Sequence, residues 1–115
     1  MTVNQIIIEA LKSFGIPIVP NFYEGESEEY ITFNYADDRA ALYADNDPVT
    51  NISYMQIHYF LPSNKDYLED KKKMRKALHK SGFTYPGVTE LVESDNKIRH
   101  IIFECEIENE YEMEE

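Results

Sequence analysis

Residues 98–115 read IRHIIFECEIENEYEMEE, and their side chains alternate between two kinds with almost no error. Ile101, Phe103 and Cys105 hold one parity, whereas glutamates hold the other. A period of two places successive side chains on opposite faces, so the pattern predicts a long final strand. One face then carries a glutamate fence, with same-face carboxylates about 6.6 Å apart. Because like charges repel, the fence faces solvent, a basic partner or something that it repels. The fence consists of Glu104, Glu106, Glu108, Glu110, Glu112 and Glu114.

Composition limits the function further. The 115 residues include 22 acidic and 11 basic side chains, a net charge of −11, which opposes general binding of nucleic acid. The length fits one domain over residues 1–115, with an acidic extension at about 108–115. Cys105 is the single cysteine, so no intrachain disulfide can form. Neither a membrane span nor a signal peptide is evident, so we expect a cytoplasmic protein with no membrane partner.

Hydrophobic periodicity predicts the order helix, strands, helix, strands. Helical spacing covers 3–14, and alternation predicts strands over 30–35, 51–61 and from 98 onward. A shorter strand is expected over 16–22, one or two more over 83–85 and 88–92, and a turn at 94–97. Turn-forming residues make 36–50 a long connection. The prediction is an α+β two-layer sandwich, with a mainly antiparallel sheet and two helices packed on one face.

The second predicted helix follows Pro62, and Ser63 or Asn64 is expected to cap it. Its expected apolar stripe is Tyr67, Leu68, Met74 and Leu78. Seven of the eleven basic residues are assigned to it, namely Lys65, Lys71, Lys72, Lys73, Arg75, Lys76 and Lys80, whereas the final twelve residues hold seven glutamates and no basic residue. Solvated surfaces are one explanation of this polarity. The other is complementarity, in which an acidic strand meets the basic helix of the next subunit and a ring closes.

No pattern in the chain indicates catalysis or a cofactor. Asp45, Asn46 and Asp47 lack the spacing of a calcium loop, the three histidines are too dispersed for a zinc site, and the glycines do not cluster as phosphate loops require. We therefore expect no enzyme, no metal and no cofactor, with a small enzyme of unrecognised type as the remaining alternative. Cys105 is expected in the core, and His58 as an exposed strand residue.

A second surface signal lies in the strand predicted over 51–61. Tyr54, His58, Phe60 and Ile102 occupy the parity opposite the expected core. Aromatic groups on such a face are typical of an interface. The alternative is that a helix or loop covers them, and a slip of one residue would exchange the two faces.

Six segments, in this order, carry a resemblance to a known family. They are SFGIPIVP (13–20), EYITFNY (29–35), ALYADND (41–47), YMQIHYF (54–60), ALHKSGF (77–83) and HIIFECEI (100–107). With them the chain resembles the small tail-terminator, tail-completion or tail-to-head-joining proteins of long-tailed phages, in the form found in phages and prophages of Gram-positive bacteria. The acidic extension after Ile107 maps least well.

The resemblance implies a non-enzymatic virion protein that forms a ring, a hexamer on assembly, at the head-proximal end of the tail tube. Its partners would be the tail tube protein, the head connector protein and DNA that passes without specific binding. It would lie at the tail-head junction of the virion after assembly in the host cytoplasm. The residues expected at subunit or tube interfaces are Asp37, Asp38, Arg39, Tyr43, Asp45, Asp47, Tyr54, His58, Phe60, Lys72, Arg75 and Lys76. Glu104, Glu106 and Glu108 are expected in an acidic strand that lines the lumen.

The same glutamates also suit an acidic DNA mimic or inhibitor that occupies a basic groove of a nucleic-acid enzyme. Such a protein would bind its target in a salt-sensitive way. The basic second helix weighs against this alternative, because a mimic gains nothing from concentrating positive charge on one element.

Overall fold

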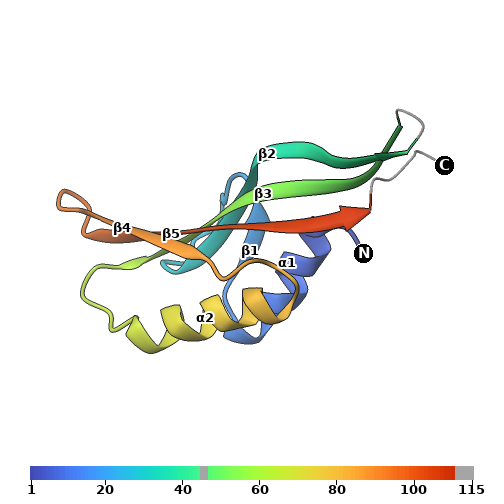
Figure 1. Cartoon of the computed structure of the whole chain (residues 1–115). Helices are drawn as coiled ribbons and strands as arrows, with labels where there is room; N and C mark the ends of the chain where they lie inside the picture. The colour runs from blue at the N-terminus through green and yellow to red at the C-terminus, as the bar shows by residue number, and fades with distance from the viewer. Residues whose placement is uncertain (45–46, 111–115) are drawn as a thin grey trace.

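The computed structural model describes residues 1–44 and 47–110, with the side chains of all of these except 41–44, 47–49, 109 and 110 (Figure 1). Its elements are α1 (Val3–Leu11), a 3-10 turn η1 (Lys12–Phe14), β1 (Ile18–Pro20), β2 (Tyr30–Ala44), β3 (Asp47–Pro62), α2 (Leu68–Lys80), β4 (Gly87–Glu93) and β5 (Ile98–Glu110). The sheet has the order β1-β2-β3-β5-β4. β1 and β2 are parallel, and the other three neighbouring pairs are antiparallel. The predicted α+β architecture is confirmed.

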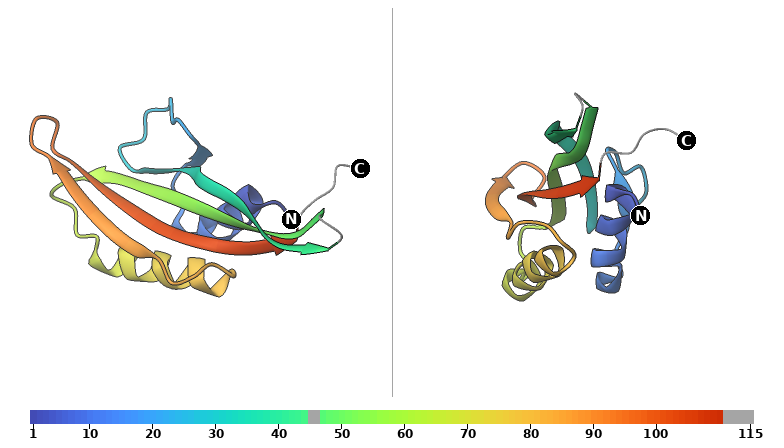
Figure 2. Two further views of the ribbon diagram at one scale, coloured as in Figure 1. Left: turned by 45° about the horizontal axis from the view of Figure 1, so that its top comes forward. Right: turned by 45° about the vertical axis from the view of Figure 1, so that its right-hand side comes forward.

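Both helices pack on one face of the sheet, as predicted (Figure 2). The alternation in β3 and β5 sends one parity into this layer, where Ile57, Tyr59, Ile101 and Phe103 are fully buried. Each such side chain contributes about 1.5 to 3 kcal/mol to folding. The other buried apolar residues are Val3, Ile7, Leu11, Ile31, Phe33, Met55, Leu61, Met74, Leu78, Phe83, Cys105 and Ile107. The predicted core location of Cys105 is therefore confirmed.

The first helix begins at a capping box. The backbone N–H of Gln5 donates to the Thr2 hydroxyl at 3.1 Å, and the Thr2 N–H donates to the Gln5 side chain at 2.7 Å. These bonds satisfy backbone groups that a helix start leaves unpaired. Gly15, with φ of +72°, ends the η1 turn in the left-handed region that glycine adopts most easily. The helix predicted over 3–14 is thus α1 followed by η1.

The predicted start of the second helix is wrong. The Ser63 N–H donates to Lys97 O at 2.9 Å and the Lys65 N–H to Pro62 O at 3.1 Å, so this segment is a turn. The helix begins at Leu68, whose N–H donates to Asp66 Oδ1 at 3.3 Å. Lys65 therefore lies outside α2. The expected apolar stripe is correct for Met74 and Leu78, but Leu68 is 60% exposed.

The expected long connection over 36–50 is also wrong, because β2 and β3 continue through most of it. Their register shifts between Tyr35 and Asp37, which marks a bulge. Asp38 beyond the bulge accepts hydrogen bonds from Ser53 Oγ at 2.8 Å and from the Asn51 side chain. Such partners let acidic residues sit within a strand. The extended end of the sheet projects beyond α2 (Figure 1).

Of the one or two strands predicted over 83–85 and 88–92, the structure forms one, β4, and residues 83–85 form no strand. The Thr84 N–H nevertheless donates to Glu106 O at 2.9 Å and the Thr84 hydroxyl accepts from the Glu106 N–H at 3.0 Å. The predicted turn over 94–97 is confirmed and joins β4 to β5.

Candidate functional site

The sheet face opposite the helices carries the largest group of predicted site residues. We call it the open face; it comprises Tyr30, Thr32 and Asn34 on β2, Tyr54, Gln56, His58 and Phe60 on β3, and His100, Ile102, Glu104, Glu106 and Glu108 on β5. Most of these side chains are partly or fully exposed, whereas the neighbours of the four β3 residues along that strand are buried. The parity assigned to Tyr54, His58, Phe60 and Ile102 is therefore correct. A face of this kind can bind a partner without a change in the fold.

An aromatic column crosses one end of the open face. Tyr23 stacks on Tyr30 with ring centroids 4.5 Å apart, Tyr30 on Phe60 at 4.8 Å, and Phe60 on His100 at 4.2 Å. Tyr23 comes from the loop between β1 and β2, so a loop covers part of this end. The alternative that a loop covers this face is correct only at this edge, and the expectation of an interface stays a prediction.

A chain of polar side chains follows the aromatic column across the open face. His58 Nδ1 lies 2.8 Å from His100 Nε2, and His58 Nε2 lies 2.9 Å from Asn34 Oδ1. Asn34 Nδ2 then donates to Gln56 Oε1 at 3.4 Å, and Gln56 Nε2 donates to Glu104 Oε2 at 3.2 Å. These partners assign the tautomers, because His58 must donate from Nε2 and accept at Nδ1 from His100. The expectation that His58 is exposed is wrong, because its side chain is half-buried between Asn34 on β2 and His100 on β5.

The surroundings of the two imidazoles favour their neutral forms. Burial lowers the pKa of His58, and the neighbouring His100 lowers it further, while Glu104 acts in the opposite direction. Burial also lowers the pKa of His100. At neutral pH the pair is therefore an uncharged, hydrogen-bonded unit between β3 and β5.

The acidic part of the open face lies at its other end. Glu104 and Glu108 are exposed and Glu106 is half-buried, and none of the three forms an ion pair among the described residues. Across β3, Arg39 pairs with Asp37 at 2.6 Å and lies 6.0 Å from the Tyr54 ring centroid. The Asp38 N–H and then Arg39 lower the pKa of Asp37. A shallow hollow of about 440 Å³ lies between these groups. The charged side chains of its lining are three carboxylates, Asp37, Glu104 and Glu106, and one arginine, Arg39.

The basic residues of α2 lie in the other layer of the molecule. Lys72 and Lys76 are exposed. Arg75 is engaged, because it donates to Pro86 O at 3.0 and 2.7 Å and its guanidinium lies 4.6 Å from the Tyr85 ring centroid. Arg75 thus holds the segment before β4 against α2.

The predicted interface residues therefore form two surfaces rather than one. Asp37, Arg39, Tyr54, His58 and Phe60 share the open face with the glutamates, whereas Lys72 and Lys76 lie across the molecule on α2. Asp38 points to the opposite side of β2. Tyr43 and Asp47 lie in strands, and their side chains, like the whole of Asp45, fall outside the described residues.

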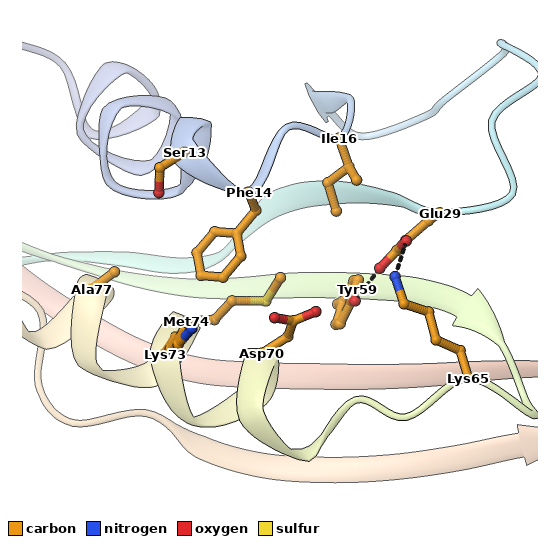
Figure 3. Close-up of a pocket in the computed structure, with 10 residues that line it drawn as sticks. All are labelled: Ser13, Phe14, Ile16, Glu29, Tyr59, Lys65, Asp70, Lys73, Met74 and Ala77. Atoms are coloured by element: carbon orange, nitrogen blue, oxygen red, sulfur yellow. Dashed lines mark hydrogen bonds and ion pairs between the residues drawn. The ribbon is translucent and has the colours of Figure 1, made fainter.

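A further site lies between the helices and has no signal in the sequence. We call it the helix groove; Figure 3 shows its lining, Ser13, Phe14, Ile16, Glu29, Tyr59, Lys65, Asp70, Lys73, Met74 and Ala77, around about 440 Å³. Glu29 accepts a hydrogen bond from the Tyr59 hydroxyl and pairs with Lys65 Nζ at 2.6 Å. Burial and then Glu29 raise the pKa of Tyr59. The Tyr59 hydroxyl is thus a donor at every physiological pH.

The surroundings of Cys105 suppress the reactivity of its thiol. Burial and then Glu106 raise the pKa of the Cys105 thiol to about 12, which keeps it in the unreactive form. Among residues 1–44 and 47–110, no three His, Cys, Asp or Glu side chains gather in a way that could hold a metal ion. In the same part of the chain, no helix is long and apolar enough to cross a membrane.

Comparison with known proteins leaves the resemblance as a prediction. No protein-family model matches the chain, and no curated protein matches it either. The open face, the exposed lysines of α2 and the helix groove are therefore the features that bear on function.

Proposed function

We propose that this chain is a non-enzymatic structural protein of a long-tailed phage or prophage, which caps the head-proximal end of the tail tube as a ring and joins the tail to the head connector. One observation supports this most directly. Exposed lysines lie on α2 in one layer, and Glu104, Glu106 and Glu108 of β5, which form no ion pair within the described part of the chain, lie on the open face in the other. A molecule with two different complementary surfaces associates head to tail rather than through one shared patch.

Head-to-tail contacts close into a ring when each contact turns the next subunit by a fixed fraction of a full rotation. For the hexamer that the resemblance implies, that fraction is one sixth. The open face of one subunit would meet α2 of its neighbour, with Glu104, Glu106 and Glu108 near Lys72 and Lys76. Exposed charges of opposite sign guide such an encounter and disfavour the reversed orientation.

The acidic strand also suits a channel through which DNA passes. Phosphate groups are repelled by carboxylates, so a wall that carries Glu104 or Glu108 would not retain the duplex. DNA would then be a passing partner without specific binding. The protein would act in the virion at the tail-head junction and be present in the host cytoplasm during assembly.

The decisive experiment mixes the purified protein with assembled tail tubes from the same source and follows tube ends and tube lengths by electron microscopy. Rings at one tube end, and tubes of limited length, are expected. A chain with Glu104, Glu106 and Glu108 reversed to Lys should fail in assembly or in DNA passage. A wild-type protein that ignores tubes would refute the proposal, and a charge-reversed chain that assembles and passes DNA normally would refute the role of the strand.

An acidic DNA mimic or inhibitor of a nucleic-acid enzyme is the second candidate, favoured by the three regularly spaced carboxylates on the open face. It predicts a salt-sensitive complex with a DNA-handling enzyme and no effect on tubes. The exposed lysines of α2 weigh against it, because they would repel the basic groove that a mimic must enter.

A further inference from the structure

The loop between β1 and β2 presents an apolar ring to solvent. Phe22 is 81% exposed, although it is a large aromatic residue. The turn that carries it is fixed by two backbone bonds, from the Asn21 N–H to Phe33 O at 2.9 Å and from the Phe22 N–H to Pro20 O at 2.8 Å. Asn21 has φ of +66°, a region in which asparagine is enriched among non-glycine residues. The outward direction of Phe22 is thus set by the backbone.

The rest of this loop is ordered around Tyr23 and not around Phe22. Tyr23 stacks on Tyr30, and its hydroxyl accepts a hydrogen bond from the Ser27 N–H at 2.9 Å. Gly25 lies so close to the Tyr23 ring that any Cβ there would overlap the phenol group. A loop that is already ordered loses little further freedom on binding, which favours affinity.

Acidic residues follow the exposed ring in the same loop. Glu24, Glu26 and Glu28 are all exposed and form no ion pair among the described residues. An aromatic centre with a charged rim is the usual anatomy of a binding hot spot. The matching surface is an apolar hollow with lysines beside it.

The helix groove has that chemistry (Figure 3). Phe14, Ile16, Met74 and Ala77 supply apolar lining, and its volume of about 440 Å³ exceeds that of a phenyl ring. Lys73 lies at its edge, next to the exposed Lys72 and Lys76 on α2.

Two carboxylates in the groove bear on the fit. Glu29 is neutralised by Lys65 and bonded to Tyr59, so Asp70 is the one groove carboxylate that forms no ion pair among the described residues. The positive charges of Lys72, Lys73 and Lys76 on α2 exceed the single negative charge of Asp70.

Phe22 does not lie in the groove of its own molecule. The lining residues include Glu29 at the end of this loop but not Phe22 (Figure 3). The large exposed fraction of Phe22 agrees with this arrangement. Phe22 and the helix groove of one molecule are therefore both available to a second copy of the chain.

We propose that Phe22 of one copy inserts into the helix groove of a second copy, with the acidic loop against Lys73 in the lining of that groove. The contact is heterologous, so it leaves a free Phe22 and a free groove at the two ends of any open chain of subunits. It would supply the neighbour contact of the proposed ring, and in that respect it rests on the proposed function.

The test follows methyl and amide NMR signals of the whole chain over a dilution series up to about 1 mM, a range that detects weak association. In the wild type, the signals of Met74 and Ala77 should shift with concentration. Phe22→Ala should weaken this self-association by roughly 20-fold or more, as for a hot-spot aromatic. Val92→Ala is the matched control, since Val92 is also exposed but lies on β4. Unchanged groove signals in the wild type, or shifts that persist in Phe22→Ala, would overturn the contact.

A charge exchange gives an independent readout. Lys73→Glu in one copy and Glu26→Lys in another should each weaken self-association, and a mixture of the two variants should restore it. No restoration, with both variants folded, would overturn the proposed alignment of loop and α2.

Tail tubes separate this contact from the proposed function. Copies that associate through Phe22 but ignore tubes would refute the tail-terminator function and leave the contact standing. Wild-type and Phe22→Ala chains that cap tubes equally well would refute the contact and leave the function standing.

Discussion

Acidification should destabilise the fold through the His58 and His100 pair. Each imidazole has a pKa in the folded protein below its unfolded value, mainly because of burial. The unfolded chain then binds more protons than the folded one over the interval between the two values. The stabilisation by the neutral pair is therefore fully present above the unfolded pKa of about 6.5 and is lost as the pH falls from there through the folded pKa.

The hydrogen bond between the rings sets the size of the effect. A first proton can be accommodated, because a charged His100 still donates from Nε2 to His58 Nδ1. A second proton puts two N–H donors 2.8 Å apart, so the bond breaks. Each imidazole can change the free energy of unfolding by at most about 1.4 kcal/mol per pH unit. Since both rings are partly solvated, we expect a total loss of about 1 to 2 kcal/mol between about pH 7.5 and about pH 5.5.

Urea unfolding, followed by circular dichroism at the two pH values, measures this loss. Ionised carboxylates change little in that interval because their usual pKa values are near 4. His58→Gln and His100→Gln should each reduce the dependence on pH, whereas His79→Gln, on the exposed side of α2, is the control. A wild type with equal stability at both pH values, or a double Gln variant with the same loss as the wild type, would refute the argument.

Three further predictions concern single side chains. Tyr59→Phe removes a buried hydroxyl bonded to a carboxylate and should lower the free energy of unfolding in urea by about 1 to 2 kcal/mol; no change would mean that the bond contributes nothing. Gly25→Ala should displace the Tyr23 ring, seen as shifted Tyr23 aromatic NMR signals, whereas Gly87→Ala, where an added Cβ meets nothing within 4 Å, should leave them unchanged. Cys105 should react with a thiol reagent far more slowly in the folded chain than in urea, because burial raises its pKa to about 12; equal rates would contradict its placement in the core.

Strand faces could be predicted from the sequence because the period of two survives over long stretches. Ile57 and Phe103 were assigned to the core and are fully buried, and His58 and Glu104 were assigned to the other face and lie there. The alternation of side chains assigns faces correctly when a strand is regular and one of its faces is buried, and both conditions hold for β3 and β5.

The continuation of β2 and β3 through most of residues 36–50 could not be predicted, because turn-forming residues indicate only the local conformation of the backbone. Asp37 and Asp38 are poor strand residues by propensity. A bulge and the partners Arg39, Asn51 and Ser53 satisfy both carboxylates, and these partners depend on the register of β2 against β3. The helix cap predicted at Ser63 is wrong for the same reason. The Ser63 N–H donates to the backbone carbonyl of Lys97, which lies in the turn before β5.

The polar sites were invisible for a related reason. His58 and His100 are 42 residues apart, and Tyr59 and Glu29 are 30 apart. No pattern in the sequence sets the offset between two strands that far apart, so neither pair carries a spacing signal. The exposed Phe22 lies at the end of the strand predicted over 16–22, whereas β1 ends at Pro20 and the direction of Phe22 depends on the conformation of Asn21.

The acidity of the projecting end of the sheet restricts how copies can meet. β1 pairs with β2 only over Ile18–Pro20, and β4 pairs with β5 only as far as Glu104, so the ends of β2 and β5 have edges unpaired by strands among the described residues. Free edges favour pairing between copies. In a symmetric pair of β5 strands the glutamates would face one another across about 5 Å, which is destabilising. The same charges are attracted by the lysines of α2. Glu104, Glu106 and Glu108 thus disfavour symmetric pairing and favour the head-to-tail contact that the proposed ring requires.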